Sequence, residues 1–579
     1  QAPDTAGYFS IATATRTGVT LRFDGISEVT PDKFTVTDGI TGAPVDARNI
    51  NSYVLTGAAN NSNMTTDIQR NAYVNVGRDI AWRFPVAVKM GLDFRQSARD
   101  FSRAEGNVAN AVYSFVGKDG RGSTTPVGSD DGAAPYWATA LSERALPWGF
   151  PAAQWVSQAK TWEAFRATPS LFTIDQNARY RNQVGASKFA SEVVSAAYLR
   201  GDLALLNRRL RIVGGLRAEQ TNIDAQGPFT DVTRNYQRDA AGRVVTVASP
   251  IPADPARRVP AAIFPSGTLG FSQLTYLERG ASVEKEYLRL FPNLNVSFNV
   301  RDNLILRAAR YTSIGRPDFN QYAGGLTLPD VEAPPSRSNL ITVNNAAIRP
   351  WAAESTNARV EYYFEGVGQV SAGVFRRDFR NFFGGTFFPA TPEFLALYGL
   401  DADTYGDFDV ATQYNLPGTV RMEGITVNYK QALTFLPDWA RGIQVFGNVS
   451  RQRVTGAAAD FFSGYQPKGA NGGVSLTRAH YNLRVNFNYQ GQRRQGQITA
   501  TGTDRIGPAI YTWRDDRLYI DVLGEVSLRR NLAFFFNLRN VNDQTERIVI
   551  SGPQTPASAR FRQSTDFGAL WTFGVKGSF

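Results

Sequence analysis

Side chains that bind metal ions or act as strong nucleophiles are scarce in this 579-residue chain. Cysteine is absent, and the one histidine, His480, stands beside Tyr481 without a histidine partner. This composition excludes disulfides, thiolate zinc sites, cysteine nucleophiles and multi-histidine metal centres. A lone histidine in a strand pattern is more typical of a structural position than of a metal ligand.

One acidic cluster is a candidate cation site. Asp401, Asp403, Asp407 and Asp409 follow a predicted helix at 392–398. Clustered carboxylates are ligands that calcium prefers. The spacing lacks the full ligand pattern of a calcium loop, however, and aspartate also stabilises turns. We therefore predict a structural acidic turn and no metal site, and keep calcium as the weaker alternative.

A tryptophan-rich segment at 106–169 is the candidate site for a solute. It contains a short predicted helix at 161–165, and aromatic rings on which sugar or aromatic ligands stack. The alternative is that these rings pack the segment's own core or line a membrane interface. The candidate substrate-binding residues are Tyr136, Trp137, Trp148, Trp155 and Trp162.

The elements that position these residues are strands with a two-residue repeat. Leu483, Val485 and Phe487 alternate with polar residues over 482–490, and 86–95, 293–299 and 531–539 behave alike. A period of two sends the two sets to opposite faces of a strand. A soluble sandwich would turn its apolar face inward, but long strands rich in Arg, Asn and Gln on the other face favour a membrane barrel. A wide lumen tolerates such charge, as at Lys89, Arg95, Arg484 and Arg539.

Connections of alternating length support the same fold. Short turns at 301–303 and 365–368 contrast with long segments at 106–169, 221–280, 318–350 and 384–419. Short periplasmic turns and long extracellular loops are the asymmetry of outer-membrane barrels. The sequence contains no run of 18 or more apolar residues, so it predicts no membrane-spanning helix. The sequence thus predicts an all-β, antiparallel transmembrane β-barrel of the outer-membrane type.

The net charge of +11 does not indicate nucleic-acid binding. The basic residues alternate with apolar ones along strands and do not gather with stacking aromatics on one face.

The final strand resembles the carboxy-terminal signal read by the outer-membrane assembly machinery. Its aromatic and apolar row is Trp571, Phe573, Val575 and Phe579, which ends the chain. Gly577 departs from the pattern, because this outward position is usually apolar.

Several segments beyond residue 180 resemble TonB-dependent outer-membrane receptors in order and spacing. They are Phe291-Pro292-Asn293-Leu294-Asn295, 304–309 with Gly315-Arg316-Pro317, 348–351, 361–364, and 538–543. The likeness is weaker before Phe84. The resemblance to this family implies a non-enzymatic, cofactor-free importer in the bacterial outer membrane. Implied partners are the TonB complex, the assembly machinery, outer-membrane lipid with lipopolysaccharide, and a solute that the motifs do not identify.

Two other functions stay open: a passive porin, and a barrel that serves as a scaffold or surface receptor for partner proteins. The porin would need no plug but would need a constriction loop. Members of the resembled family carry a plug and a barrel of 22 strands. Roughly fifteen strands are recognisable here, and an open edge in lipid is costly. We therefore expect 1–579 to be a barrel without its first strands and plug. A self-contained barrel of about 16 strands beginning at Gln1 is the competing interpretation.

Overall fold

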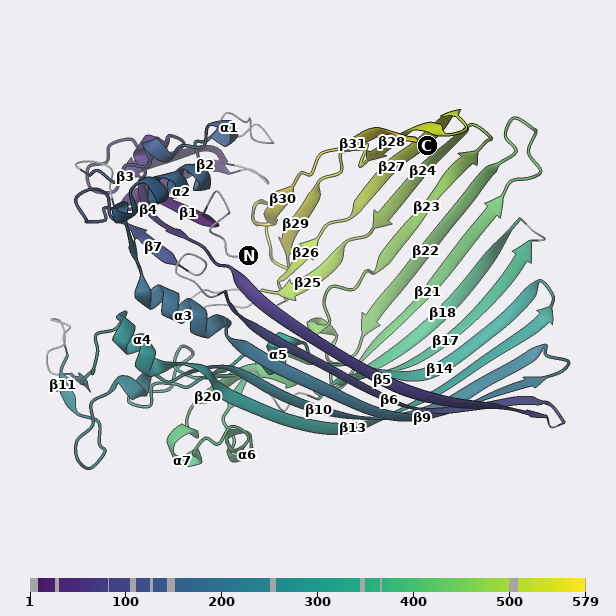
Figure 1. Cartoon of the computed structure of the whole chain (residues 1–579), viewed down its shortest axis with the longest axis horizontal. Helices are drawn as coiled ribbons and strands as arrows, with labels where there is room; N and C mark the ends of the chain where they lie inside the picture. Colours follow the sequence, from purple (N-terminus) through teal and green to yellow (C-terminus); the bar gives the residue numbers. More distant parts are fainter. Residues whose placement is uncertain are drawn as a thin grey trace.

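Long antiparallel strands dominate the computed structural model (Figure 1). It describes residues 9–26, 31–81, 83–104, 111–124, 129–142, 151–249, 257–343, 349–364, 367–498 and 509–577. None of the helices in these ranges is long and apolar enough to span a membrane. The predicted all-β class is confirmed.

Fifteen of the described strands form one curved wall, in which each strand pairs antiparallel with its chain neighbours. The wall forms a barrel whose strand order returns from β31 to β5. The strands are β5 (Asn63–Ala81), β6 (Pro85–Arg103), β9 (Lys188–Leu205), β10 (Leu210–Thr230), β13 (Tyr276–Arg301), β14 (Leu304–Gly315), β17 (Trp351–Phe364), β18 (Gly368–Arg380), β21 (Thr419–Ala432), β22 (Ile443–Thr455), β23 (Lys468–Thr477), β24 (Tyr481–Gln490), β27 (Arg517–Arg529), β28 (Leu532–Arg539) and β31 (Leu570–Gly577).

The two faces of the wall differ in polarity. Across five strands, opposed residues form an apolar row of Leu306, Val360, Ala372, Val427 and Val449. Leu483, Val485 and Phe487 continue this character on β24, where they are about two-fifths exposed. Opposed residues share a face, so the apolar rows form one surface and the arginine-rich rows line the lumen. This is the alternation of a membrane barrel.

Connection length separates the two ends of the barrel (Figure 1). Short connections, such as 206–209, 302–303 and 478–480, lie at one end, and the segments 104–187, 231–275, 316–350 and 381–418 lie at the other. The predicted segment 221–280 is therefore too long at both ends. Residues 221–226 pair with both β9 and β13 and therefore belong to the wall.

The long connections carry additional strands. β15 (Leu326–Thr327) pairs with the end of β10, and β16 (Ile341–Val343), β20 (Asp409–Asn415) and β19 (Phe383–Pro389) follow in order. A separate sheet contains β25 (Arg493–Gln497), β26 (Tyr511–Arg514), β29 (Glu546–Ser551) and β30 (Phe561–Thr565).

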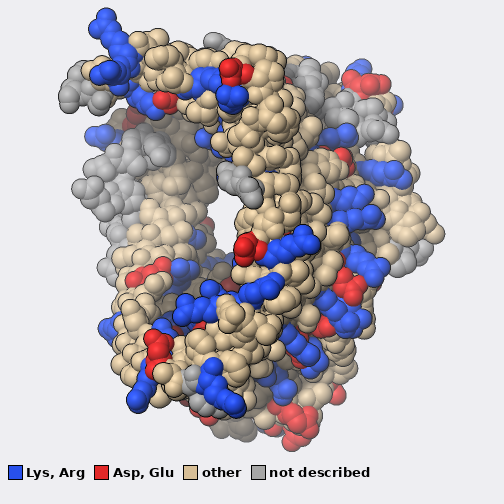
Figure 2. Space-filling model, turned by 90° about the vertical axis from the view of Figure 1, so that its right-hand side faces the viewer, with Lys and Arg blue, Asp and Glu red and all other residues tan. Residues whose placement is uncertain are grey.

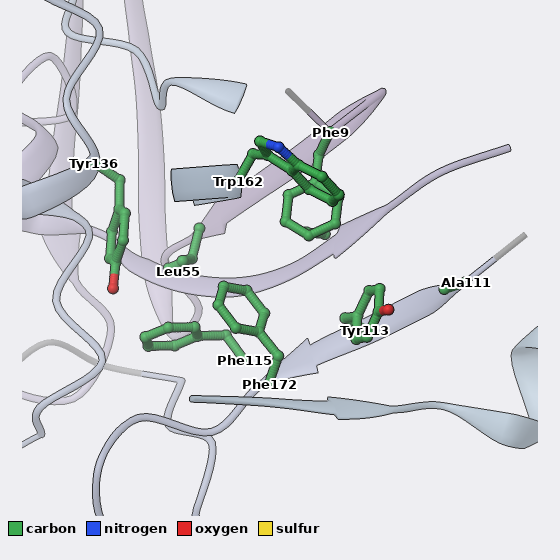
Figure 3. Close-up of a cluster of buried hydrophobic side chains, with 9 residues drawn as sticks. Phe9, Leu55, Ala111, Tyr113, Phe115, Tyr136, Trp162 and Phe172 are labelled. Atoms are coloured by element: carbon green, nitrogen blue, oxygen red, sulfur yellow. The ribbon is translucent and has the colours of Figure 1, made fainter. Parts of the chain in front are cut away.

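Residues 9–59 depart from the expectation that the whole chain forms the barrel. Their strands β1 (Ile11–Thr15) and β4 (Val54–Ala59) join β7 (Val112–Phe115) and β8 (Phe172–Ile174) in a four-stranded sheet outside the wall. β2 (Val19–Ile26) and β3 (Pro31–Asp38) form a hairpin beside it. We call 9–59 with 111–174 the small sheet unit. Its strands are too short to span a bilayer, and they bury a shared core (Figure 3).

Candidate solute-binding site at the barrel mouth

The aromatic residues predicted to bind a solute separate into two groups. Tyr136 and Trp162 are buried in the core of the small sheet unit, where Trp162 packs edge-to-face on Phe9 at 5.1 Å between ring centroids (Figure 3). α2 (Gln158–Ala167), which includes the predicted helix at 161–165, carries Trp162. These two rings therefore pack the core of the small sheet unit, as the alternative interpretation predicted.

The remaining candidates are less enclosed. Trp155 is 52% exposed and Trp137 is half-buried. Trp148 lies outside the described residues. Contact between a solute and Trp137 or Trp155 stays a prediction.

The acidic turn has a structural role in the fold. Asp401 caps α7 (Ala402–Tyr405) and accepts hydrogen bonds from the Thr404 amide and hydroxyl at 2.9 and 2.7 Å. These bonds lower the pKa of the Asp401 carboxyl. The predicted helix at 392–398 is α6 (Pro392–Ala396). No set of three or more acidic, histidine or cysteine side chains suited to a metal ion occurs among the described residues.

A pocket of about 630 Å³ lies on the lumen side of the barrel mouth. The ends of β5, β6 and β9 form one side, and α3 (Gln176–Ala186) and α5 (Phe319–Tyr322) form the other. The lining residues are Thr65, Arg99, Phe101, Arg103, Arg181, Asn182, Gly185, Ala186, Lys188, Phe319 and Asn320.

Local hydrogen bonds hold the two helices over the strands. Asp175 caps α3 by accepting from the Ala178 amide at 2.9 Å, and the Tyr180 hydroxyl donates to the Tyr276 carbonyl at 2.9 Å. Asp318 and Gln321 form a reciprocal capping box on α5. These contacts fix the helices without using the pocket's cations.

The pocket is rich in positive charge. Arg99, Arg103, Arg181 and Lys188 line it, and Asp67 pairs with Arg99 at 2.6 Å. Phe101 and Phe319 add apolar surface, and the Arg99 guanidinium lies 5.7 Å from the centre of the Phe319 ring. Cations beside aromatic faces suit an anionic solute with a flat or apolar portion.

Ion pairs continue down the lumen wall. Arg217 on β10 bonds Glu219 at 2.6 Å and reaches across β9 to Asp93 on β6 at 2.8 Å. Arg316 bonds Glu219 at 2.6 Å, and Arg307 bonds Glu361 at 3.1 Å. Seen from the short-turn end, the molecule is hollow, and Lys and Arg side chains are prominent beside the opening (Figure 2). The lumen wall is therefore charged and compatible with water.

Sequence reasoning found only part of this site. Arg95 was assigned to the lumen by alternation, and it lies 2.8 Å from Asp93 there. The pocket's four cations were missed, because they come from two strands and a helix that are far apart in the chain. The available signal was the odd-numbered series Arg95, Arg99 and Arg103, which continues the lumen face of β6.

The predicted assembly signal lies on an accessible face of the last strand. Trp571, Phe573 and Val575 are each more than half exposed, and Phe573 stacks with Phe534 at 6.3 Å. Phe579 lies outside the described residues. Recognition by the assembly machinery stays a prediction.

Comparison with known proteins identifies the family. Residues 5–541 match the family described as TonB dependent receptor-like, beta-barrel. No curated protein matches the chain.

The solved structures that match the chain have low sequence identity to it. The ferric-catecholate import receptor Fiu from E. coli is 12% identical, with a TM-score of 0.49, and the match covers 98% of this chain and 59% of Fiu. The siderophore receptor PiuA from Acinetobacter baumannii is 10% identical, with a TM-score of 0.46 and coverages of 94% and 60%. The FrpB iron transporter from Neisseria meningitidis is 12% identical, with a TM-score of 0.47 and coverages of 91% and 59%. The chain thus spans about three-fifths of the length of these receptors. The family match over most of the chain carries the assignment: this protein belongs to the TonB-dependent receptors of the bacterial outer membrane, and it includes their β-barrel.

Proposed function

We propose that this chain forms the barrel of an active importer that takes up a scarce or bulky solute, with energy supplied through TonB. The family match over residues 5–541 carries the proposal. The charged lumen and the cationic pocket at its mouth support the proposal. The pocket provides a recognition site, and the lumen behind it provides a water-compatible route. A plug that TonB acts on belongs to this proposal as a partner of the barrel.

The pocket favours an anionic solute. Three of its four cations, Arg103, Arg181 and Lys188, have no ion-pair partner among the described residues, while Arg99 is paired with Asp67. Unneutralised cations in a partly enclosed pocket attract carboxylate, phenolate or phosphate groups. The two phenylalanines would contact the apolar part of the same molecule.

Uptake in matched cells with and without functional TonB tests the mechanism. Cells that produce the full protein should accumulate the solute only when TonB is present. Equal accumulation in both strains would support the passive porin instead. Normal surface display with no accumulation of any tested solute would support the scaffold or surface receptor.

A pair of pocket variants tests the site. Replacing Arg181 and Lys188 together by Ala should weaken binding of an anionic solute about tenfold or more, since hydrogen bonds to charged groups contribute about 1.5–3 kcal/mol each. Arg539→Ala, on the lumen face but outside the pocket, is the matched control. Equal affinities in both variants would move the binding site away from this pocket.

We further propose that the outer face binds anionic lipid, with lipopolysaccharide as the partner. Arg310, Arg376 and Arg453 lie in register across the face, one step beyond the apolar row of Val374 and Ile425. An apolar groove of about 510 Å³ lies on that row. Arginines beside a groove suit a phosphate group attached to acyl chains.

A further inference from the structure

A fully buried carboxylate lies in the small sheet unit without a hydrogen-bond partner. Asp131 is 0% exposed, and neither carboxylate oxygen has a partner of normal hydrogen-bond geometry, although the Ser129 hydroxyl and the Ser123 backbone lie near enough to favour its charged form. Its backbone is well anchored, because the Asp131 carbonyl accepts from the Leu55 amide of β4 at 2.9 Å. The backbone of Asp131 is therefore fixed beside β4, and no cationic side chain among the described residues pairs with its carboxylate.

A second carboxylate faces the same space. Gly117 has a positive φ of 61°, and the position of its absent Cβ lies 2.6 Å from Asp131 Oδ1 and 2.7 Å from Asp130 Oδ1. The two carboxylates thus lie side by side against the Gly117 backbone, so closely that any side chain at residue 117 would clash with them. Asp119, in the same turn, increases the negative potential at Asp131.

No cationic side chain among the described residues neutralises this charge. Among the described residues, no lysine or arginine forms an ion pair with Asp130 or Asp131. Buried carboxylates in proteins are paired, protonated or bound to a metal ion. The choice here lies between a proton and a cation.

We propose that Asp130 and Asp131 bind a calcium ion between the turns at 117–120 and 129–132. The ligands are oxygen alone, which suits calcium, and two carboxylates are fewer than calcium requires, so carbonyl oxygens and water complete the set. The ion joins the two turns to β4 through the anchored backbone of Asp131. Calcium therefore stabilises the small sheet unit at the long-connection end of the barrel.

Terbium luminescence and thermal melting of the purified protein in detergent test this site, after chelator treatment and dialysis. Tb³⁺ should give a saturable signal that Ca²⁺ displaces, and Ca²⁺ should raise the melting temperature of the small sheet unit. Asp131→Asn should abolish both effects. Asp130→Asn, at an exposed position that does not threaten folding, should weaken Ca²⁺ affinity about tenfold or more, since affinity follows the number of charged ligands.

Asp403→Asn, in the acidic turn that follows α6, is the matched control and should leave both signals unchanged. If the wild-type protein shows neither signal at millimolar Ca²⁺, the proposal is wrong. Signals that persist in both the Asp130 and Asp131 variants would also overturn it. Loss of solute uptake is not a readout here, so this test is independent of the importer proposal.

Discussion

At the scale of single residues, substitutions of Trp155 and Trp162 distinguish a role in solute binding from a role in packing. Trp162 is 5% exposed and contacts Phe9 and Phe165, whereas Trp155 is 52% exposed. Trp162→Ala should destabilise the small sheet unit by about 3–5 kcal/mol, because it removes a large buried ring. Trp155→Ala should change its stability by about 0.5 kcal/mol or less.

Hydrogen exchange of the β4 and β7 amides measures both effects without relying on tryptophan fluorescence. If Trp155→Ala also lowers solute uptake while exchange is unchanged, Trp155 contacts the solute. Faster exchange in Trp155→Ala than in Trp162→Ala would contradict the assignment of the buried ring to packing.

The lipid-facing surface gives a second test on single residues. Phe487 is 42% exposed on an apolar row, and its neighbour Asn488 has the opposite orientation on β24. Phe487→Arg should lower the free energy of unfolding by about 2–4 kcal/mol if the side chain lies near the bilayer midplane. Asn488→Arg, on the lumen face, should have little effect. Unfolding titrations in lipid vesicles measure both variants, and equal losses would contradict the assignment of the two faces.

At the scale of elements, the strands β5 and β31 differ from the rest of the wall. All 19 residues of β5 are exposed, and β31 is almost as open. An odd number of consecutive antiparallel strands makes β5 and β31 run in the same direction. Single-chain barrels of the bacterial outer membrane have even strand numbers. The strand order of the structure runs directly from β31 to β5, but we predict that further strands lie between them in the membrane.

Engineered disulfides test the seam in a chain that has no natural cysteine. Val76→Cys combined with Met90→Cys, which lie opposite each other on β5 and β6, should cross-link readily. Val76→Cys combined with Phe573→Cys or Val575→Cys should not, because intervening strands separate the thiols beyond the reach of a disulfide. Efficient β5–β31 cross-linking in the full protein would instead support the small self-contained barrel.

At the scale of the whole molecule, the outer face has the charge expected at a lipid headgroup layer. Arg376 and Arg421 share Asp378 at 2.9 and 2.8 Å, and Arg453 bonds Glu423 at 2.9 Å. These arginines outnumber the carboxylates that they contact, so positive charge remains at the edge of the apolar band. The lipid proposal therefore concerns a surface composed of several strands.

Charge reversal tests that surface. Arg376→Glu with Arg453→Glu should reduce the lipopolysaccharide that copurifies with the protein, since each basic residue near a charged membrane surface contributes about 1 kcal/mol. Lys89→Glu, on the lumen face, should leave the amount unchanged. Phosphate analysis and native mass spectrometry of the detergent-purified protein measure bound lipid. An unchanged lipid content in the double variant would contradict specific binding of lipopolysaccharide and would mean that this surface contacts only bulk lipid.

The amino-acid sequence determined the periodic features of this protein. Alternation with a period of two assigned Leu483 and Arg484 to opposite faces, because neighbouring side chains in a strand necessarily diverge. Local signals also predicted the helices near 161–165 and 392–398, and the motifs beyond residue 180 predicted the family. These features depend on a few adjacent residues or on their order along the chain.

The tertiary structure alone decided which distant residues meet. Register across β6, β9 and β10 brings Asp93 to Arg217, and loop folding brings α3 and its Arg181 to Arg99. The segment at 106–169 lies among the long connections, but the packing of most of its described part with residues 9–59 around Phe9 and Leu55 was not predicted. Such contacts depend on strand register and on competition between buried surfaces, and both are properties of the whole fold that no local pattern contains.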